Sequence, residues 1–202
     1  MSHMDNGGKL VVISGPSGVG KSTISKEVLR RTGAEFSVSV TTRKPRPGEV
    51  AGRDYLFVEL SEFERMIKQG ELLEWAEVFG NMYGTPAGPV GLAIEAGRTV
   101  LLEIDVQGAL QVYEKMPTAT FILIAPPSDE ELARRLAGRG TEDEQSFRRR
   151  LGKARDELAT ARQSGAYGHI VINDDLEAAM SQVVEIVQGH GPNQIKTGAT
   201  ND

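Results

Sequence analysis

The sequence contains no cysteine among its 202 residues. A disulfide framework and a thiolate metal site are therefore both excluded. Long apolar runs are missing as well, since none approaches the ~20 residues that a membrane-spanning helix needs. Residues 1–8 also lack the charged and apolar regions of a signal peptide. These absences lead us to expect a cytoplasmic protein that has no membrane contact.

An excess of positive charge is also missing. The chain has 23 Lys and Arg residues against 28 Asp and Glu residues, which gives a net charge of −5. General nucleic-acid binders are usually basic, so this class is disfavoured. The basic run Arg148 to Arg150 has acidic neighbours and is interpreted as a solvated helix face with one arginine at the active site. We expect no nucleic-acid partner, and no feature indicates an obligate protein partner.

Short β-branched runs alternate with helical patterns along most of the chain. The runs at residues 9–14, 99–105, 120–125 and 169–173 predict buried strands of a parallel sheet. Helices are predicted over 21–31, 86–96, 128–137, 143–163 and 176–187, and another begins at Ser61 with Glu64 completing a capping box. Strands alternating with helices indicate a three-layer α/β fold with a mostly parallel central sheet.

One segment breaks this alternation and is interpreted as an inserted subdomain. Residues 36–90 contain two short predicted strands, 36–40 and 55–58, around a loop rich in Pro, Gly and Arg. The domain is predicted to span 9–187, with a core of 9–35 and 97–187 and a short lid at about 138–146, where Gly138-Arg139-Gly140 interrupts the helical pattern. The polar ends, 1–8 and 188–202, are expected to be disordered.

A phosphate-binding loop follows the first predicted strand. Residues 15–22 match G-x-x-x-x-G-K-[ST] between a strand and a helix, which is the context that this motif requires. Backbone N–H groups of such a loop cradle phosphate oxygens, and the helix N-terminus adds partial positive charge. Lys21 is predicted to reach the β- and γ-phosphates, and Ser22 to bind Mg²⁺. The predicted ATP-binding residues here are Gly15, Pro16, Ser17, Gly18, Val19, Gly20, Lys21, Ser22 and Thr23.

The loop alone does not identify the reaction, because kinases, GTPases and motor ATPases share it. A GTPase needs an Asn-Lys-x-Asp motif to read guanine, and the sequence has none. The acceptor side is more informative. Arg43 and Arg46 lie three residues apart in a loop punctuated by prolines, and guanidinium groups match phosphate oxygens bidentately.

The segment around these arginines resembles the guanylate kinase family, and the resemblance extends over about residues 9–187. The motifs that carry it are Phe36-Ser-Val-Ser39, Arg43-x-Pro-Arg46-x-Gly-Glu49, Gly52-x-Asp54-Tyr55, Glu71-x-x-Glu74-Trp75-Ala76, Gly80-x-x-Tyr83-Gly84-Thr85, Glu103-Ile-Asp105-Val-Gln107-Gly108, Ala125-Pro-Pro-Ser128, Gly138-Arg139-Gly140-Thr141-Glu142 and Ile172-Asn173-Asp174-Asp175. The combination is far more specific than the phosphate-binding loop. It implies a P-loop NTPase fold with an insert that binds a nucleoside monophosphate and a short lid.

The resemblance also implies roles for individual residues. Arg43, Arg46 and Tyr55 would hold the GMP phosphate, and Glu74, Ser39, Thr85, Tyr83 and Asp105 would surround or read guanine. Lys21, Arg43, Arg135, Arg139 and Arg150 would form the catalytic charge clamp, Asn173 would lie against adenine, and Glu103 would act on Mg²⁺ through water. Two positions depart from the family pattern, which often has Asp at 103 and Ser at 85.

The implied activity is Mg²⁺-dependent phosphoryl transfer from ATP to GMP, giving ADP and GDP in purine nucleotide metabolism. Two alternatives remain at this point. One is a kinase of similar fold for another phosphorylated acceptor, such as ribose 1,5-bisphosphate, which needs no set of guanine-reading residues. The other is a binding module for phosphorylated peptides, like the guanylate kinase-like domains of scaffold proteins. The intact Gly20-Lys21-Ser22 and the lid arginines favour the enzyme.

Overall fold

The computed structural model describes residues 7–78, 80–137 and 144–189. These form a five-stranded central sheet and a four-stranded second sheet. The central strands, in spatial order, are β2 (Glu35–Phe36), β7 (Thr99–Glu103), β1 (Lys9–Ser14), β8 (Thr120–Ala125) and β9 (His169–Ile172). All four pairings between them are parallel. The central sheet is therefore the parallel sheet that the sequence predicts.

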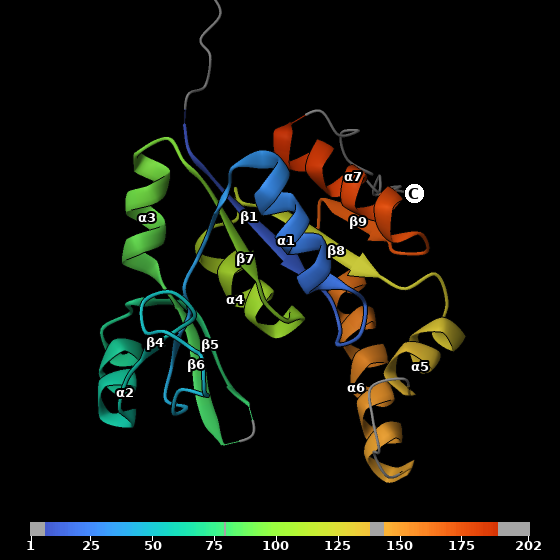
Figure 1. Ribbon diagram of the computed structural model, residues 1–202, viewed down its shortest axis with the longest axis horizontal. Helices are drawn as coiled ribbons and strands as arrows, with labels where there is room; N and C mark the ends of the chain where they lie inside the picture. The colour runs from blue at the N-terminus through green and yellow to red at the C-terminus, as the bar shows by residue number, and fades with distance from the viewer. Residues whose placement is uncertain (1–6, 79, 138–143, 190–202) are drawn as a thin grey trace, which may run out of the picture.

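Helices cover both faces of this sheet (Figure 1). Val11 and Ile13 of β1 pack in one hydrophobic cluster with α1 (Lys21–Thr32) and α7 (Leu176–Gln188). Leu10 and Val12 point to the other face and pack with α3 (Ala87–Glu95) and α4 (Val106–Lys115). Because neighbouring β1 residues point to opposite faces and both faces are buried, the strand is a continuous apolar run. The three-layer α/β prediction is confirmed.

The second sheet is made entirely by the segment that interrupts the sequence pattern. Its order is β4 (Leu56–Phe57), β3 (Val40–Thr41), β6 (Asn81–Pro86) and β5 (Leu72–Val78). The helix α2 (Leu60–Lys68) buries Phe63 against Val40 and Leu72, and these three residues form a small core separate from the central one. The β5–β6 pair is antiparallel, and Val78 at the end of β5 lines the same pocket as residues that follow the carboxyl end of β1.

One sequence expectation about this region needs correction, and two neighbouring elements were missed. The strand expected at 36–40 is two strands, because Phe36 pairs with β7 in the central sheet whereas Val40 pairs within the second sheet. The hairpin β5–β6 and the helix α4 were not predicted. In β6, Gly84 and Pro86 argue against a strand by composition. In α4, a glycine at position 108 weakens the helical pattern.

The ends of several elements also differ from prediction. The capping box at Ser61 is wrong: α2 begins at Leu60, its N-cap is Glu59, and that side chain makes no capping hydrogen bond. Burial of Phe63 decides where this helix lies. In contrast, the Ser128 hydroxyl accepts from the backbone N–H of Glu131 at 3.2 Å, as a helix opening there requires. Residue 105 is an N-cap rather than the end of a strand, since β7 stops at Glu103.

The remaining helices are α5 (Asp129–Ala137) and α6 (Glu144–Gln163). The proposed lid at 138–146 falls mostly outside the described residues, as does Arg139, and residues 144–146 begin α6. Of the ends expected to be disordered, Gln188 is the last residue of α7 and Gly189 its C-cap. Within the described ranges, no helix combines the length and the apolar character needed to cross a membrane.

Candidate active site

The phosphate-binding loop lies at the carboxyl edge of the central sheet, between β1 and α1. Gly20 is the N-cap of α1 with φ of 94°, a left-handed conformation that glycine adopts without a steric penalty. A Cβ atom there would also lie 2.5 Å from the side-chain nitrogen of Asn173. That buried amide donates to the carbonyl oxygen of Val19 at 2.7 Å. The Asn173 side chain thus holds the loop in place through the Val19 carbonyl group.

Lys21 begins α1 and lies over the start of the same loop. Its ammonium group donates to the carbonyl oxygens of Gly15 at 2.5 Å and Pro16 at 2.9 Å. The loop therefore holds the Lys21 ammonium near the N-terminus of α1, where the backbone N–H groups also concentrate positive potential. The arrangement suits a polyphosphate anion.

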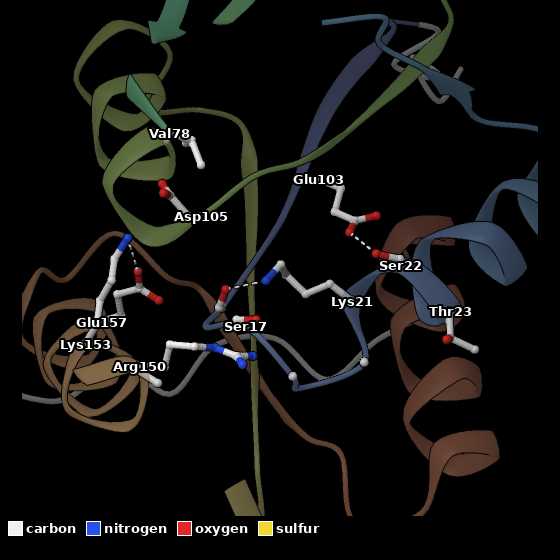
Figure 2. Close-up of a pocket in the computed structure, with 14 residues that line it drawn as sticks. Ser17, Lys21, Ser22, Thr23, Val78, Glu103, Asp105, Arg150, Lys153 and Glu157 are labelled. Atoms are coloured by element: carbon white, nitrogen blue, oxygen red, sulfur yellow. Dashed lines mark hydrogen bonds and ion pairs between the residues drawn. The ribbon is translucent and has the colours of Figure 1, made fainter. Parts of the chain in front are cut away.

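Ser22, in the first turn of α1, contacts Glu103, the last residue of β7. β1 and β7 are in register with Ile13 opposite Glu103, so the end of β7 lies beside the start of the loop. The Ser22 hydroxyl donates to the Glu103 carboxylate at 2.5 Å (Figure 2). A hydroxyl and a carboxylate at one point are oxygen ligands of the kind that Mg²⁺ uses together with substrate phosphates. In the described part of the chain, no cluster of three or more His, Asp or Glu residues could hold a metal by itself.

Gly15, Gly20, Lys21, Ser22 and Glu103 line a pocket of about 440 Å³, a volume typical of small-molecule sites. Its other wall comes from α4, α6 and the end of β5 (Figure 2). The lining from these elements is Asp105, Arg150, Lys153, Ala154, Glu157 and Val78. Arg150 on α6 thus lines the same pocket as the phosphate-binding loop, and its predicted role in clamping the phosphates stays a prediction.

Sequence reasoning missed Lys153 and Glu157. Both follow Arg150 at helical spacings of three and seven residues, so a helix that points Arg150 into the pocket brings them to the same face. The Lys153 ammonium lies 3.6 Å from the Glu157 carboxylate. Burial raises the pKa of Glu157, and Lys153 is the largest opposing influence. The spacing after Arg150 is the signal that could have identified them.

A second group of residues surrounds Arg43, which follows β3 of the second sheet. The Arg43 guanidinium donates to both carboxylate oxygens of Glu49, at 2.8 and 3.0 Å, and to the Tyr83 hydroxyl at 3.2 Å. The Tyr55 ring lies 5.3 Å from the guanidinium carbon. The Arg43 guanidinium is the main cause that holds the pKa of Glu49 below its usual range. Three of the residues predicted to surround the acceptor, namely Arg43, Tyr55 and Tyr83, are therefore in contact.

Glu74 and Thr85 form the third group. They are direct partners in the β5–β6 ladder, which explains how residues eleven apart in sequence meet. The Thr85 hydroxyl donates to the Glu74 carboxylate at 2.6 Å, and both residues are buried. Burial raises the pKa of Glu74 to about 7, Asp105 raises it further and Lys115 lowers it, as does the Thr85 hydrogen bond. A buried carboxylate of this kind is typical of functional sites.

Asp105 connects this group with the phosphate-binding pocket. It lines that pocket, and its carboxylate caps α4 by accepting from the backbone N–H of Gly108 at 2.8 Å. Gly108 in turn lies against the Glu74 carboxylate. One turn of α4 thus separates the buried pair from the wall of the phosphate-binding pocket.

Other predicted site residues lie elsewhere. Arg46 is exposed, and its backbone N–H donates to Glu49 at 2.7 Å. The carbonyl oxygen of Ser39 accepts from the backbone N–H of Leu56. Arg135 pairs with Glu131 on α5 at 2.6 Å and does not line the pocket. The clamp role of Arg135 and the contact of Asn173 with adenine stay predictions, since the observed partners are within the protein.

The comparisons with known proteins agree on one family. The family model described as guanylate kinase matches residues 7–190. A guanylate kinase of Gloeobacter violaceus is 52% identical over 180 residues, 89% of this chain and 86% of the relative. One of Bacillus anthracis is 50% identical over 184 residues, 90% of this chain and 88% of the relative.

A solved structure agrees as well. The crystal structure of guanylate kinase from Anaplasma phagocytophilum superimposes with a TM-score of 0.69 at 37% identity, covering 95% of this chain and 88% of the other. The sequence match spans both the central sheet and the insert that carries Arg43, Glu74 and Thr85. The chain therefore belongs to the guanylate kinase family of nucleoside monophosphate kinases.

Proposed function

We propose that the chain transfers the γ-phosphoryl group of ATP to GMP in a Mg²⁺-dependent reaction. One observation carries the proposal. The buried Glu74–Thr85 pair, which suits a guanine edge, lies one helical turn from Asp105 on the wall of the phosphate-binding pocket. An acceptor bound at the first and a donor bound at the second would present their phosphates to each other.

The donor half-site consists of the loop from Gly15 to Thr23. Its backbone N–H groups and Lys21 would bind the β- and γ-phosphates. Ser22 and Glu103 would hold Mg²⁺, directly or through water, and the ion would supply charge neutralisation between the phosphates. Glu103 is one methylene longer than aspartate, and its contact with Ser22 shows that it reaches the hydroxyl.

The acceptor half-site would use Arg43, Arg46 and Tyr55 for the GMP phosphate and the Glu74–Thr85 pair for the base. Both phosphates are anionic, so Lys21, Arg43 and Arg150 have to offset their repulsion as they approach. No side chain needs to act as a strong base, because a nucleotide phosphate is already largely ionised near neutral pH. We include a cytoplasmic location, expected from the sequence, in the same proposal.

The two alternatives are less well supported. A kinase for ribose 1,5-bisphosphate has no use for a buried carboxylate and hydroxyl paired across a hairpin. A scaffold module for phosphorylated peptides needs no intact phosphate-binding loop, whereas here the loop is complete, Lys21 bonds to its first carbonyl and Ser22 bonds to Glu103. Both alternatives predict no GDP formation.

The direct test is an assay for GDP. Purified protein, shown to be folded by circular dichroism, should convert ATP and GMP to ADP and GDP when Mg²⁺ is present and not after EDTA treatment. AMP and ribose 1,5-bisphosphate serve as competing acceptors at the same concentration. Absence of GDP at saturating substrates would contradict the enzymatic proposal, and faster turnover of the sugar phosphate would favour the first alternative.

The raised pKa of Glu74 predicts a pH dependence of GMP binding. The ionised carboxylate accepts both guanine N–H donors, so protonation below about pH 7 should weaken GMP binding by up to about tenfold per pH unit. The pH dependence of folding stability has the opposite sign to that of GMP binding. Because the folded-state pKa lies above the ordinary 4.5, Glu74 contributes to the free energy of unfolding below that value and loses this contribution as pH rises through about 7.

The measurement is the Kd of GMP between about pH 5.5 and 8. The phosphate of GMP titrates in the same range, so Glu74→Gln serves as the control that retains only the phosphate titration. A wild-type profile parallel to that of the variant would show that Glu74 does not titrate on binding.

A further inference from the structure

Gly108 lies in the first turn of α4, directly against the Glu74 carboxylate. A Cβ atom at this position would be 2.9 Å from Oε2 and 3.4 Å from Cδ of Glu74. Its backbone does not have the left-handed conformation that requires glycine. Glycine is unfavourable inside a helix compared with alanine, so the backbone gives no reason for it here. The neighbouring carboxylate is what excludes a side chain.

The strand that carries Glu74 is held to α4 on both sides of that residue. The Gln111 side chain donates to the Trp75 carbonyl oxygen at 2.9 Å and accepts from the Trp75 N–H at 3.1 Å. The Lys115 ammonium donates to the Leu72 carbonyl oxygen at 2.7 Å. Because these bonds fix the distance between β5 and α4, the backbone at Glu74 cannot withdraw from a larger residue at position 108. Only the flexible end of the glutamate can move.

We propose that Gly108 is a positioning residue for base recognition, which leaves the space where the Glu74 carboxylate lies between the Thr85 hydroxyl and α4. This inference rests on the proposed GMP kinase function and adds a specificity determinant to it. A methyl group at 108 would displace the carboxylate away from α4 without disturbing the phosphate-binding loop. Base reading would be impaired, while ATP binding and the fold would be kept.

The test compares Gly108→Ala with Gly91→Ala. Gly91 lies in α3, and a Cβ atom there would meet nothing within 4 Å, so it is a matched helical control. For Gly108→Ala we expect KM for GMP to rise about 10- to 100-fold, because misplacement of about 1 Å has effects of this size. KM for ATP should stay within about twofold, and Gly91→Ala should match the wild type in both constants.

Two further readouts separate positioning from loss of structure. The preference for GMP over IMP, which lacks the 2-amino group, should narrow in Gly108→Ala, whereas partial unfolding would lower both activities alike. In a Glu74→Asp background, where the shorter carboxylate leaves room, adding Gly108→Ala should have a much smaller effect on kcat/KM for GMP, or on the melting temperature if the single variant is unstable. The inference is overturned if the effects of the two substitutions are additive, or if Gly108→Ala keeps the KM for GMP and the preference of the wild type. Failure of the proposed function itself would appear as inactive wild-type protein.

Discussion

Replacement of Lys21 by alanine should lower kcat by about two or more orders of magnitude, with only a modest change in KM for GMP. The ammonium group lies at the start of the phosphate-binding loop, 2.5 Å from the Gly15 carbonyl oxygen. Bound ATP would exchange those carbonyl contacts for phosphate oxygens, on which negative charge develops during transfer. Removal of one such electrostatic stabiliser costs about 10²- to 10³-fold in other enzymes.

The loop itself should remain folded in this variant. The variant loses the two lysine contacts to the Gly15 and Pro16 carbonyl oxygens but keeps the left-handed glycines and the hydrogen bond from Asn173 to the Val19 carbonyl oxygen. Lys26→Ala is the matched control, because Lys26 is an exposed lysine of the same helix. Steady-state kinetics with ATP and GMP, with circular dichroism of both variants, provide the measurement. Turnover close to that of the wild type would remove Lys21 from the mechanism.

The phosphate-binding loop of the proposed donor half-site could be predicted from the sequence because its determinants are local. A strand, a glycine-rich turn and a helix follow one another, and the spacing from Gly15 to Ser22 fixes which backbone groups converge. Glu103 could be predicted only by resemblance, because its proximity to Ser22 depends on the pairing of β7 with β1. Parallel pairing across a crossover leaves no signal in neighbouring residues.

The proposed acceptor half-site was more difficult to predict from the sequence, for a physical reason. Leu72, Leu73 and Glu74 are all buried, and a register shift between Leu72 and Glu74 removes the alternation by which a strand is recognised. In the sequence alone, a buried glutamate also cannot be distinguished from one that faces water. Its burial becomes understandable only when Thr85 lies opposite and Gly108 admits the carboxylate. These are tertiary contacts, so the hairpin and α4 were missed while the motif identified the residues.

Replacement of Glu74 by glutamine should remove most of the GMP activity and narrow the preference for GMP over AMP. Guanine presents two donors, N1–H and N2–H₂, beside the O6 acceptor. The Glu74 carboxylate can accept from both donors while its Oε1 also receives the Thr85 hydroxyl. A glutamine amide accepts at one end only and directs its own N–H groups at the other, so one guanine donor is left unpaired in a buried site.

The hydrogen-bonding groups of adenine explain why the preference for GMP over AMP should narrow. Adenine has an acceptor at N1 and a donor at position 6, so the wild-type carboxylate faces a lone pair when AMP binds. Sites built around buried hydrogen bonds reject such analogues by about 10⁴-fold. An amide donor at position 74 relieves that repulsion, so kcat/KM for AMP should rise or hold while the value for GMP falls. KM for ATP should barely change, because Glu74 does not line the phosphate-binding pocket.

The measurement is kcat/KM for GMP and for AMP in the wild type, in Glu74→Gln and in Glu77→Gln. Glu77 is an exposed glutamate of the same strand, so its amide should behave as the wild type. Equal melting temperatures would show that the loss at position 74 is one of recognition. If Glu74→Gln retained the full preference for GMP, the carboxylate would not read the base. Asp105, the N-cap residue of α4, would then have to carry the specificity together with the hydroxyls of Ser39 and Thr85.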